Sequence, residues 1–218
     1  MAAGGGAVII ADLSSNNSTP DFAAMRDAGV VGVWLKVSEG STWSDPAYSA
    51  FERAAHRAGL KVGGYHYARP DTGDGTVADA LAEASWFLSR LRLRRGDLLP
   101  VLDFEEGKAA HLGPARLQTW AARFLKDVGL KVGAVPVFYS YPSYIADTLA
   151  GAPALRSWPL WLASYGSNDG ARHPYRAPAG FRVVAHQYTS NGRVAGYRGR
   201  LDLSATVGKS LRSLTYQG

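Results

Sequence analysis

The chain has 218 residues, of which 46% are apolar and 19% are charged, and its formal net charge at pH 7 is +6. This length suits one large α/β domain or two small ones, and the apolar content predicts a packed core rather than a disordered chain. Cysteine is absent, so disulfides and a thiolate nucleophile are excluded. No apolar run approaches the roughly 20 residues that cross a bilayer, and we therefore expect no membrane insertion.

Charge and terminal composition set expectations about partners and location. The positive net charge favours acidic partners, but arginine and lysine are scattered along the chain, so we expect no nucleic-acid partner. Residues 1–7 are predicted to be a flexible leader, because neither the basic nor the apolar part of a secretion signal precedes Val8. We therefore expect no signal peptide and synthesis in the cytoplasm. The histidines show no metal-ligand spacing, so we predict neither a metal nor a cofactor.

Apolar runs and turn residues predict strands that alternate with helices along the first two thirds of the chain. The expected strands are residues 8–11, 30–37, 60–67, 98–105, 135–140, 160–165, 182–188 and a short one that ends near residue 203. The expected helices are residues 20–28, 46–59, 77–91, 117–128 and a short one within 142–150. Asn191-Gly192 predicts a tight turn before the last strand.

This order predicts an α/β fold in which residues 8–218 form a single domain. Five strand–helix units followed by three strands suit an irregular TIM-like (β/α)5(β)3 barrel with eight strands and about five helices. An open doubly wound sheet is the alternative. The barrel is favoured because eight strands are expected and no phosphate-binding glycine loop follows the first one.

The segment from Leu98 to Glu106 is the strongest candidate for a functional site. Four apolar residues and a proline lead into Asp103 and Glu105, which are separated by one aromatic residue. Side chains alternate along a strand, so the two carboxylates would share a face with their Cα atoms roughly 6.5–7 Å apart. Such a pair suits acid–base chemistry on a glycosidic bond. The alternative is a strand end that carries solvated acids or a salt bridge.

If the fold is a barrel, polar residues at the carboxyl ends of its strands mark the active face. Those residues are Asp12, Glu39, Tyr65, Tyr67, Asp103, Glu105, Tyr139, Tyr165, Gln187, Tyr188 and Asp202. Carboxylates suit proton transfer and flat rings suit the faces of sugars, so this composition indicates a carbohydrate substrate. For any single aromatic residue, packing in the core is the competing interpretation.

Several segments, in this order, resemble glycoside hydrolase family 25, the Chalaropsis-type lysozymes of bacteria and their phages. They are Ile10-Ala11-Asp12-Leu13-Ser14, Leu35-Lys36-Val37-Ser38-Glu39-Gly40, residues 58–67, Leu102-Asp103-Phe104-Glu105, Pro136-Val137-Phe138-Tyr139, residues 159–165 and residues 187–192 with Val194, Gly196 and Asp202. The resemblance covers nearly the whole chain. It implies a barrel with eight strands and five helices, and hydrolysis of the β-1,4 bond between N-acetylmuramic acid and N-acetylglucosamine in peptidoglycan.

The resemblance also implies roles for individual residues. Glu105 would be the general acid, and Asp103 would orient the acetamido group of the substrate or stabilise charge beside it. Asp12 and Asp202 would complete the set of catalytic carboxylates. Expected sugar contacts are Tyr65, Tyr67, Tyr139, Trp161 and Gln187, together with Tyr165 and Glu39 from the strand ends.

Three positions depart from the family pattern. Asn16 and Asn17 stand where the family usually has His or Tyr and then Gln, and His186 stands where it usually has tryptophan. These departures concern sugar contacts and leave the general acid in place. We expect His186 to be a packed residue or a rim residue.

Competing functions and settings follow from the same residues. The leading hypothesis is a monomeric muramidase that binds glycan strands of bacterial peptidoglycan, and specifically a phage endolysin, or its catalytic domain, released at lysis. A virion-associated lysin and a non-catalytic sugar-binding barrel of a phage tail are alternatives. An amidase or peptidase would need a zinc cluster or a cysteine nucleophile. Retaining, inverting and substrate-assisted stereochemistry all remain open.

Overall fold

The strands of this protein close into a barrel. The computed structural model describes residues 8–208 and 210–218, and the predicted leader at residues 1–7 lies outside the described residues. The barrel strands, in chain order, are β1 (Ile9–Leu13), β2 (Val30–Glu39), β4 (Lys61–Tyr67), β5 (Val101–Asp103), β6 (Val137–Ser140), β7 (Leu160–Ala163), β8 (Val183–Gly192) and β9 (Leu201–Thr206). Pairing of β1 with β2 closes the ring, which confirms the predicted barrel over the open sheet.

The strand directions decide which ends meet at the mouth of the barrel. Neighbours from β1 through β8 pair in parallel, whereas β9 runs antiparallel between β8 and β1. The carboxyl ends of β1 to β8 and the amino end of β9 therefore lie at one end of the barrel. A further short strand, β3 (Trp43–Ser44), folds back antiparallel onto the end of β2.

The prediction for the last two strands was wrong in detail. Strand β8 continues through Asn191 to Gly192, which pairs with Leu201, so Asn191-Gly192 is not the expected tight turn. The last strand begins at Leu201 and continues to Thr206, past its predicted end near residue 203. The β8–β9 pairing shifts its register at two places, so the longer strand β8 stays paired with the shorter β9 over its whole second half.

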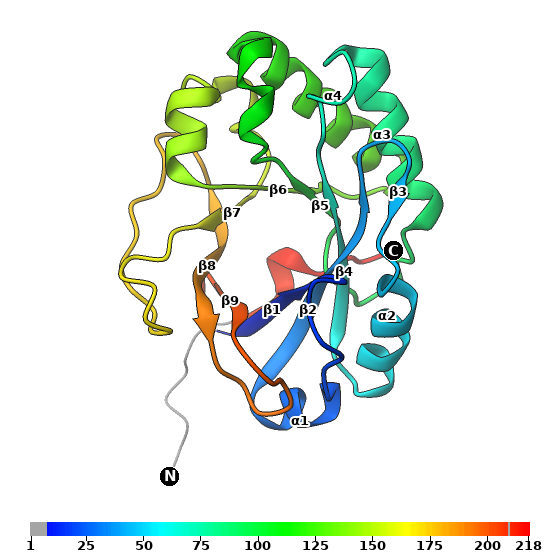
Figure 1. Cartoon of the computed structure of the whole chain (residues 1–218), viewed down its shortest axis with the longest axis vertical. Coiled ribbons are helices and arrows are strands. Elements are labelled where there is room, and N and C mark those ends of the chain that lie inside the picture. Colours follow the sequence, from blue (N-terminus) through cyan, green and yellow to red (C-terminus); the bar gives the residue numbers. More distant parts are fainter. Residues whose placement is uncertain (1–7, 209) are drawn as a thin grey trace.

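Helices cover one side of the barrel, and the side with β8 and β9 has no long helix (Figure 1). They are α1 (Phe22–Asp27), α2 (Tyr48–Arg57), α3 (Val77–Arg90) and α4 (Pro114–Val132). Helix α1 begins later than predicted, because the Asp21 carboxylate caps it by accepting the Ala24 N–H at 3.0 Å. Helix α4 continues past Gly129 and ends at Gly133, whose φ of 70° suits a glycine.

The fifth helical connection follows β6 and is short. It consists of a π-helical segment, Tyr144–Thr148, and a 3₁₀ turn, Pro153–Leu155. Two more 3₁₀ segments occur at Gly107–Leu112 and Arg212–Leu214. The five strand–helix units and three further strands thus agree with the predicted plan. No helix in the described ranges is both long enough and apolar enough to cross a bilayer.

Strand alternation separates two apolar layers. One layer, which includes Phe87, Trp120 and Phe124, packs between the outer face of the sheet and the helices. The other fills the barrel, where the Trp34 and Trp161 rings stack with their centroids 4.2 Å apart. A Cβ on Gly63 would overlap the Trp34 indole, so only glycine fits at that position on the neighbouring strand.

The end of the chain closes the bottom of the barrel. Leu214 is completely buried with Leu98 and Val101, and the Leu99 N–H donates to the Leu214 carbonyl at 2.8 Å. Thr215 forms a bridge to Leu98. Because the bottom is filled, access to the interior is from the opposite end, where the inward-facing residues become polar.

Candidate active site

A cavity of about 330 Å³ opens at the carboxyl ends of the parallel strands. Along each strand, apolar inward residues give way to a polar one at the mouth: Ile10 precedes Asp12, and Val101 precedes Asp103. The cavity is lined by Asp12, Ser14, Asn16, Asn17, Lys36, Tyr65, Tyr67, Asp103, Glu105, Tyr139, Trp161, Tyr165, Gln187 and Asp202. All site residues predicted from the sequence except Glu39 and Tyr188 therefore meet in one cavity. Tyr188 was wrongly expected at the mouth, because its side chain is buried in the apolar layer outside the barrel.

The pair Asp103 and Glu105 faces this cavity, although β5 already ends at Asp103. Phe104 points the other way and is completely buried, with its ring 5.6 Å from that of Trp120. The Phe104 N–H donates to the Tyr139 carbonyl at 3.0 Å. This anchoring continues the alternation for two residues past the strand end, which keeps both carboxylates on the cavity side.

Burial and like charge act on these two carboxyl groups. Burial raises the pKa of Asp103 well above its ordinary value, and the neighbouring Glu105 adds to the rise. Burial also raises the pKa of Glu105 to about 7, with further contributions from Asp202 and Glu106 and an opposing one from Lys36. A carboxylic acid with this pKa is partly protonated at neutral pH, so Glu105 can donate a proton there.

Asp12 and Asp202 lie opposite each other on the antiparallel pair β1 and β9. Burial and the charge of Asp202 raise the pKa of Asp12. Burial raises the pKa of Asp202, and a side-chain hydrogen bond with Asp12 offsets part of that rise. The amino end of β9, and not a strand carboxyl end as expected from the sequence, brings Asp202 to the mouth.

Gln187 organises the wall of the cavity beside Asp12. Its Nε2 donates to both Asp12 carboxylate oxygens, at 3.1 and 3.0 Å. Its Oε1 accepts hydrogen bonds from the hydroxyls of Tyr139, at 2.9 Å, and Tyr165, at 2.8 Å. The amide thus uses both of its ends to fix one carboxylate and two rings.

The aromatic residues that line the cavity differ in how deeply their rings are buried. Trp161 is almost fully buried, its ring contacts Trp34 and Tyr139, and its Nε1 donates to the Ser204 hydroxyl at 2.9 Å. It therefore forms part of the floor. Tyr67 is half-buried near the rim, and its hydroxyl lies 3.4 Å from a Glu106 carboxylate oxygen.

Lys36 lines the cavity and was not singled out from the sequence. It follows Trp34 on the inward face of β2, and its Nζ donates to Glu39 at 2.7 Å. The sequence feature that could have identified Lys36 is its place as a lone lysine in a buried, mostly apolar strand, where burying a charged side chain without a partner is unfavourable. It is the cation that opposes the pKa rises of Asp103 and Glu105.

Glu39 lies outside this cavity and lines a neighbouring hollow. Its carboxylate accepts hydrogen bonds from Lys36 and from Arg69, both at 2.7 Å. Among the positions that depart from the family pattern, Asn16 and Asn17 line the same cavity as Asp103 and Glu105. His186 is packed 4.3 Å from the Tyr175 ring, with its Nε2 at 2.7 Å from the Ser164 carbonyl.

Within residues 8–208 and 210–218, no group of three histidine, aspartate or glutamate side chains is arranged to hold a metal ion. The cavity is instead a cluster of carboxylates among tyrosines, a tryptophan and an amide. A barrel with crowded carboxylates at its mouth has the site composition of a glycoside hydrolase.

Comparison with known proteins agrees with this class. The family model for glycosyl hydrolases family 25 matches residues 11–197, and the chain belongs to this family. It is 29% identical over 194 residues to the autolytic lysozyme of Clostridium acetobutylicum, which covers 88% of this chain and 53% of that protein. It is 31% identical over 186 residues to the lysozyme of Streptococcus phage Cp-1, which covers 84% of this chain and 51% of that protein. The chain thus spans about half the length of these two relatives.

A solved lysozyme structure shares this fold. The crystal structure of the bacterial lysozyme from Streptomyces coelicolor superposes with a TM-score of 0.83 at 26% identity. The superposition covers 94% of each chain. The resemblance drawn from the sequence motifs is therefore confirmed at the level of family and fold.

Proposed function

We propose that this protein is a muramidase that hydrolyses the β-1,4 bond between N-acetylmuramic acid and N-acetylglucosamine in bacterial peptidoglycan. The observation that carries the proposal is the cavity at the mouth of the barrel, which gathers the carboxyl groups of Asp12, Asp103, Glu105 and Asp202. Burial in this cavity raises the pKa of Glu105 to about 7, which supports its role as an acid. The names of the relatives support it, since both are lysozymes.

In this proposal Glu105 is the general acid. It is less buried than Asp103, so the glycosidic oxygen can approach it. Asp103 is the partner of the substrate's acetamido group. Its Oδ1 is buried and accepts no hydrogen bond from the described residues, so the acetamido N–H would satisfy it.

We favour a substrate-assisted first step. Glu105 gives its proton to the glycosidic oxygen, the bond from that oxygen to C1 breaks, and the acetamido carbonyl oxygen bonds to C1. The resulting oxazolinium carries positive charge, which Asp12 and Asp202 would stabilise. Water then bonds to C1, the bond from C1 to the acetamido oxygen breaks, and the water gives one proton to the Glu105 carboxylate. Retention of configuration at C1 in the first product, measured by NMR, is expected, and inversion would overturn this step while leaving the acid role intact.

The remaining predicted site residues divide between positioning and sugar contact. Gln187 holds Asp12 and two tyrosines, so its proposed role is to position Asp12. Tyr65, Tyr67, Tyr139, Trp161 and Tyr165 are proposed to form the sugar-facing surface of the cavity. Glu39 is proposed to contact sugar from the neighbouring hollow.

The test compares wild type with Glu105→Gln on purified cell walls by release of reducing ends. We expect the variant to be slower by about 10²–10⁴-fold, as is typical when a general acid is lost. Asp27→Asn, which changes an exposed carboxylate at the end of α1, should cleave at the wild-type rate. Wall binding by wild type without release of reducing ends would instead identify a non-catalytic sugar-binding barrel.

We also propose that the protein acts as a monomeric endolysin or virion-associated lysin. The phage Cp-1 relative supports a phage setting, and the net charge of +6 would attract the anionic polymers of the wall. A monomer in sedimentation experiments and wall binding that weakens as salt rises are expected. A stable dimer would contradict the monomeric state. Wall binding that does not depend on salt would contradict attraction by the net positive charge.

A further inference from the structure

The net positive charge of this chain is divided unevenly along its length. Residues 148–218 contain nine arginine and lysine residues and only two aspartates, which gives this third of the chain a net charge of +7. The first 147 residues contain fifteen basic and sixteen acidic residues, so they are close to neutral. Strands β7, β8 and β9 belong to residues 148–218, and they form the side of the barrel that has no long helix (Figure 1). The excess positive charge therefore lies mainly in the elements of that side.

The two aspartates of residues 148–218 do not neutralise the arginines around them. Asp202 faces Asp12 at the mouth of the barrel, and Asp169 pairs with His173 at 2.9 Å. Within residues 8–208 and 210–218, the arginines that form ion pairs all precede residue 148, and they are Arg26, Arg69, Arg92 and Arg94. Surface cations without an acidic neighbour create a positive potential that attracts anions.

Two of these arginines line a hollow of about 390 Å³. Arg156 comes from the segment before β7, and Arg176 comes from the connection between β7 and β8. The other described residues that line the hollow are glycine, alanine, proline and isoleucine, so they include neither a carboxylate nor an aromatic ring. Pro142 of this lining is the second residue after β6, which places the hollow beside the mouth of the barrel.

The Arg156 side chain is packed into the wall of this hollow. Its Nη2 donates to the Gly151 carbonyl at 3.4 Å. Gly180 has a φ of 82°, and a Cβ at this position would lie 2.7 Å from the Arg156 Cδ, so the glycine leaves room for the arginine stem. A guanidinium group has five N–H donors, and those that Arg156 does not use within the chain are available to a ligand. Packing of the stem lowers the entropy that the side chain loses when an anion binds.

The chemistry of the hollow favours one kind of anion. The planar fork of arginine matches two oxygen atoms of a phosphate group. Nucleic-acid surfaces add aromatic rings that stack on bases, and the described lining has none. Prolines and alanines instead suit the C–H groups of a polyol chain. Arg172 and Arg182 are exposed and lie in the same β7–β8 connection as Arg176, so a polymer that repeats its phosphate groups can contact several arginines at once.

We propose that this hollow, together with Arg172 and Arg182, binds a phosphodiester-linked polyol polymer of the bacterial wall. Arg156 and Arg176 hold one phosphate group of the polymer, and the apolar lining contacts its polyol carbons. The inference rests on the proposed function and deepens it, since it assigns the attraction between protein and wall to one surface beside the mouth. Binding there keeps the mouth of the barrel close to the glycan.

The experiment measures cosedimentation with purified walls in the Glu105→Gln background, so that the walls are not consumed. One sample of walls keeps its polyol-phosphate polymer, and a second sample is stripped of it with hydrofluoric acid, which cleaves phosphodiesters. Adding Arg156→Gln and Arg176→Gln should weaken binding to the first sample by about five- to thirtyfold, as expected for two lost surface ion pairs, and the loss should shrink as salt rises. On stripped walls the same changes should have little effect. Arg156→Lys with Arg176→Lys should keep part of the affinity, because the charges remain.

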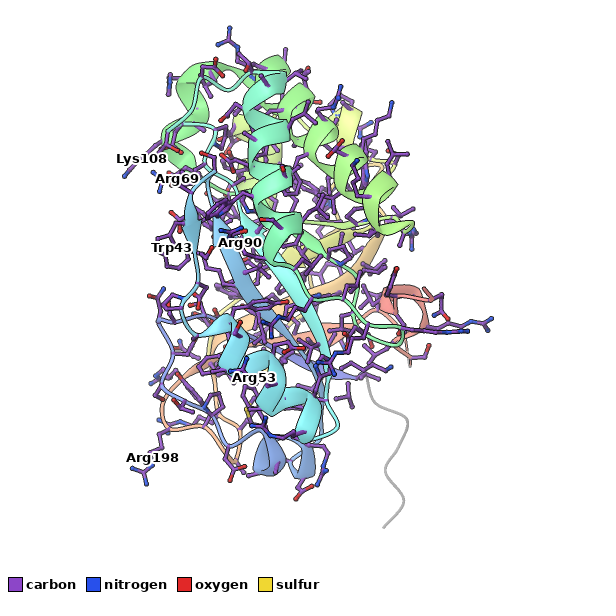
Figure 2. All side chains as sticks on the ribbon, turned by 90° about the vertical axis from the view of Figure 1, so that its right-hand side faces the viewer. Trp43, Arg53, Arg69, Arg90, Lys108 and Arg198 are labelled. Carbon is purple, nitrogen blue, oxygen red and sulfur yellow. The ribbon has the colours of Figure 1, made fainter. Side chains whose placement is uncertain are left out.

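A matched control removes the same charge from another side of the barrel. Arg53 and Arg57 are exposed on α2, and Figure 2 shows Arg53 on the helix-covered side that faces the viewer. Arg53→Gln with Arg57→Gln should bind both samples of walls nearly as the background does. Urea unfolding checks that both double variants are folded. Soluble poly(glycerol phosphate) should displace the protein from walls better than single-stranded DNA of equal charge does.

The outcomes separate this inference from the proposed function. Equal weakening by the two double variants would assign wall binding to net charge alone and overturn the inference, as would equal weakening on stripped walls or no weakening at all. Equal competition by DNA would identify a general polyanion surface and also overturn it. If wild type cleaves walls but the two double variants bind alike, the muramidase proposal stands alone. If wild type releases no reducing ends but only the loss of Arg156 and Arg176 weakens binding, the wall-polymer surface stands without the enzyme.

Discussion

Replacing Glu105 by glutamine should stabilise the fold while it slows the proposed reaction by the same factor of about 10²–10⁴. The pKa of this group is raised from an ordinary value of 4.5 to about 7. The native state therefore binds the proton more tightly than the unfolded chain does, and the ionised carboxylate opposes folding. At about 1.36 kcal/mol per pH unit, the difference of about 2.5 corresponds to about 3 kcal/mol above pH 7.

The sign of the effect depends on pH in a defined window. Below about pH 4.5 the carboxyl group is protonated in both states, so wild type and Glu105→Gln should be equally stable. Between about pH 4.5 and 7 the wild type loses stability relative to the variant, and above pH 7 the full difference is present. Because Glu105 keeps some contact with solvent, we expect about 2–3 kcal/mol there.

Urea unfolding at pH 4, 6 and 8 measures this difference directly. At pH 8 the melting temperature of Glu105→Gln should exceed that of wild type by roughly 4–12 °C, as expected for a protein of this size. Asp27→Asn should change little at any of the three pH values, since its exposed pair with Arg26 contributes about 0–1 kcal/mol. A variant that is equally stable to wild type at pH 8, or less stable, would refute the conclusion that the ionised Glu105 carboxylate opposes folding.

Two further variants test the groups around the acid. Lys36 lowers the pKa of both Glu105 and Asp103, so Lys36→Met should move both limbs of the pH profile of kcat/KM to higher pH, and Lys36→Arg should stay near wild type. An unmoved or downward-shifted profile would show that Lys36 does not tune the carboxylates. Gln187→Leu leaves Asp12 and two tyrosine hydroxyls without their partner, so it should lower the free energy of unfolding by about 2–5 kcal/mol. Urea unfolding checks this value, and a loss under 1 kcal/mol would mean that other groups replace the amide.

Local patterns in the sequence were enough to predict the Asp103–Glu105 pair. An apolar run gives a buried strand, and alternation along a strand is a property of the backbone itself, so the shared face follows without knowledge of the partners. The same local logic gave helix α3, which the structure bounds at Val77–Arg90. Strand ends that carry Asp12, Tyr139 and Gln187 also follow from short-range pattern.

Only the tertiary structure decided how distant segments meet. Asp202 faces Asp12 because β9 inserts antiparallel between β8 and β1, and strand direction depends on long-range pairing that no local pattern encodes. Lys36 reaches both the carboxylates and Trp43 because β2 pairs with β4 on one side and folds back onto β3 on the other. The sequence by itself determined which chemical groups are present and on which face of each strand they lie. Closure of the barrel determined their neighbours, and through burial and crowding it determined their pKa values.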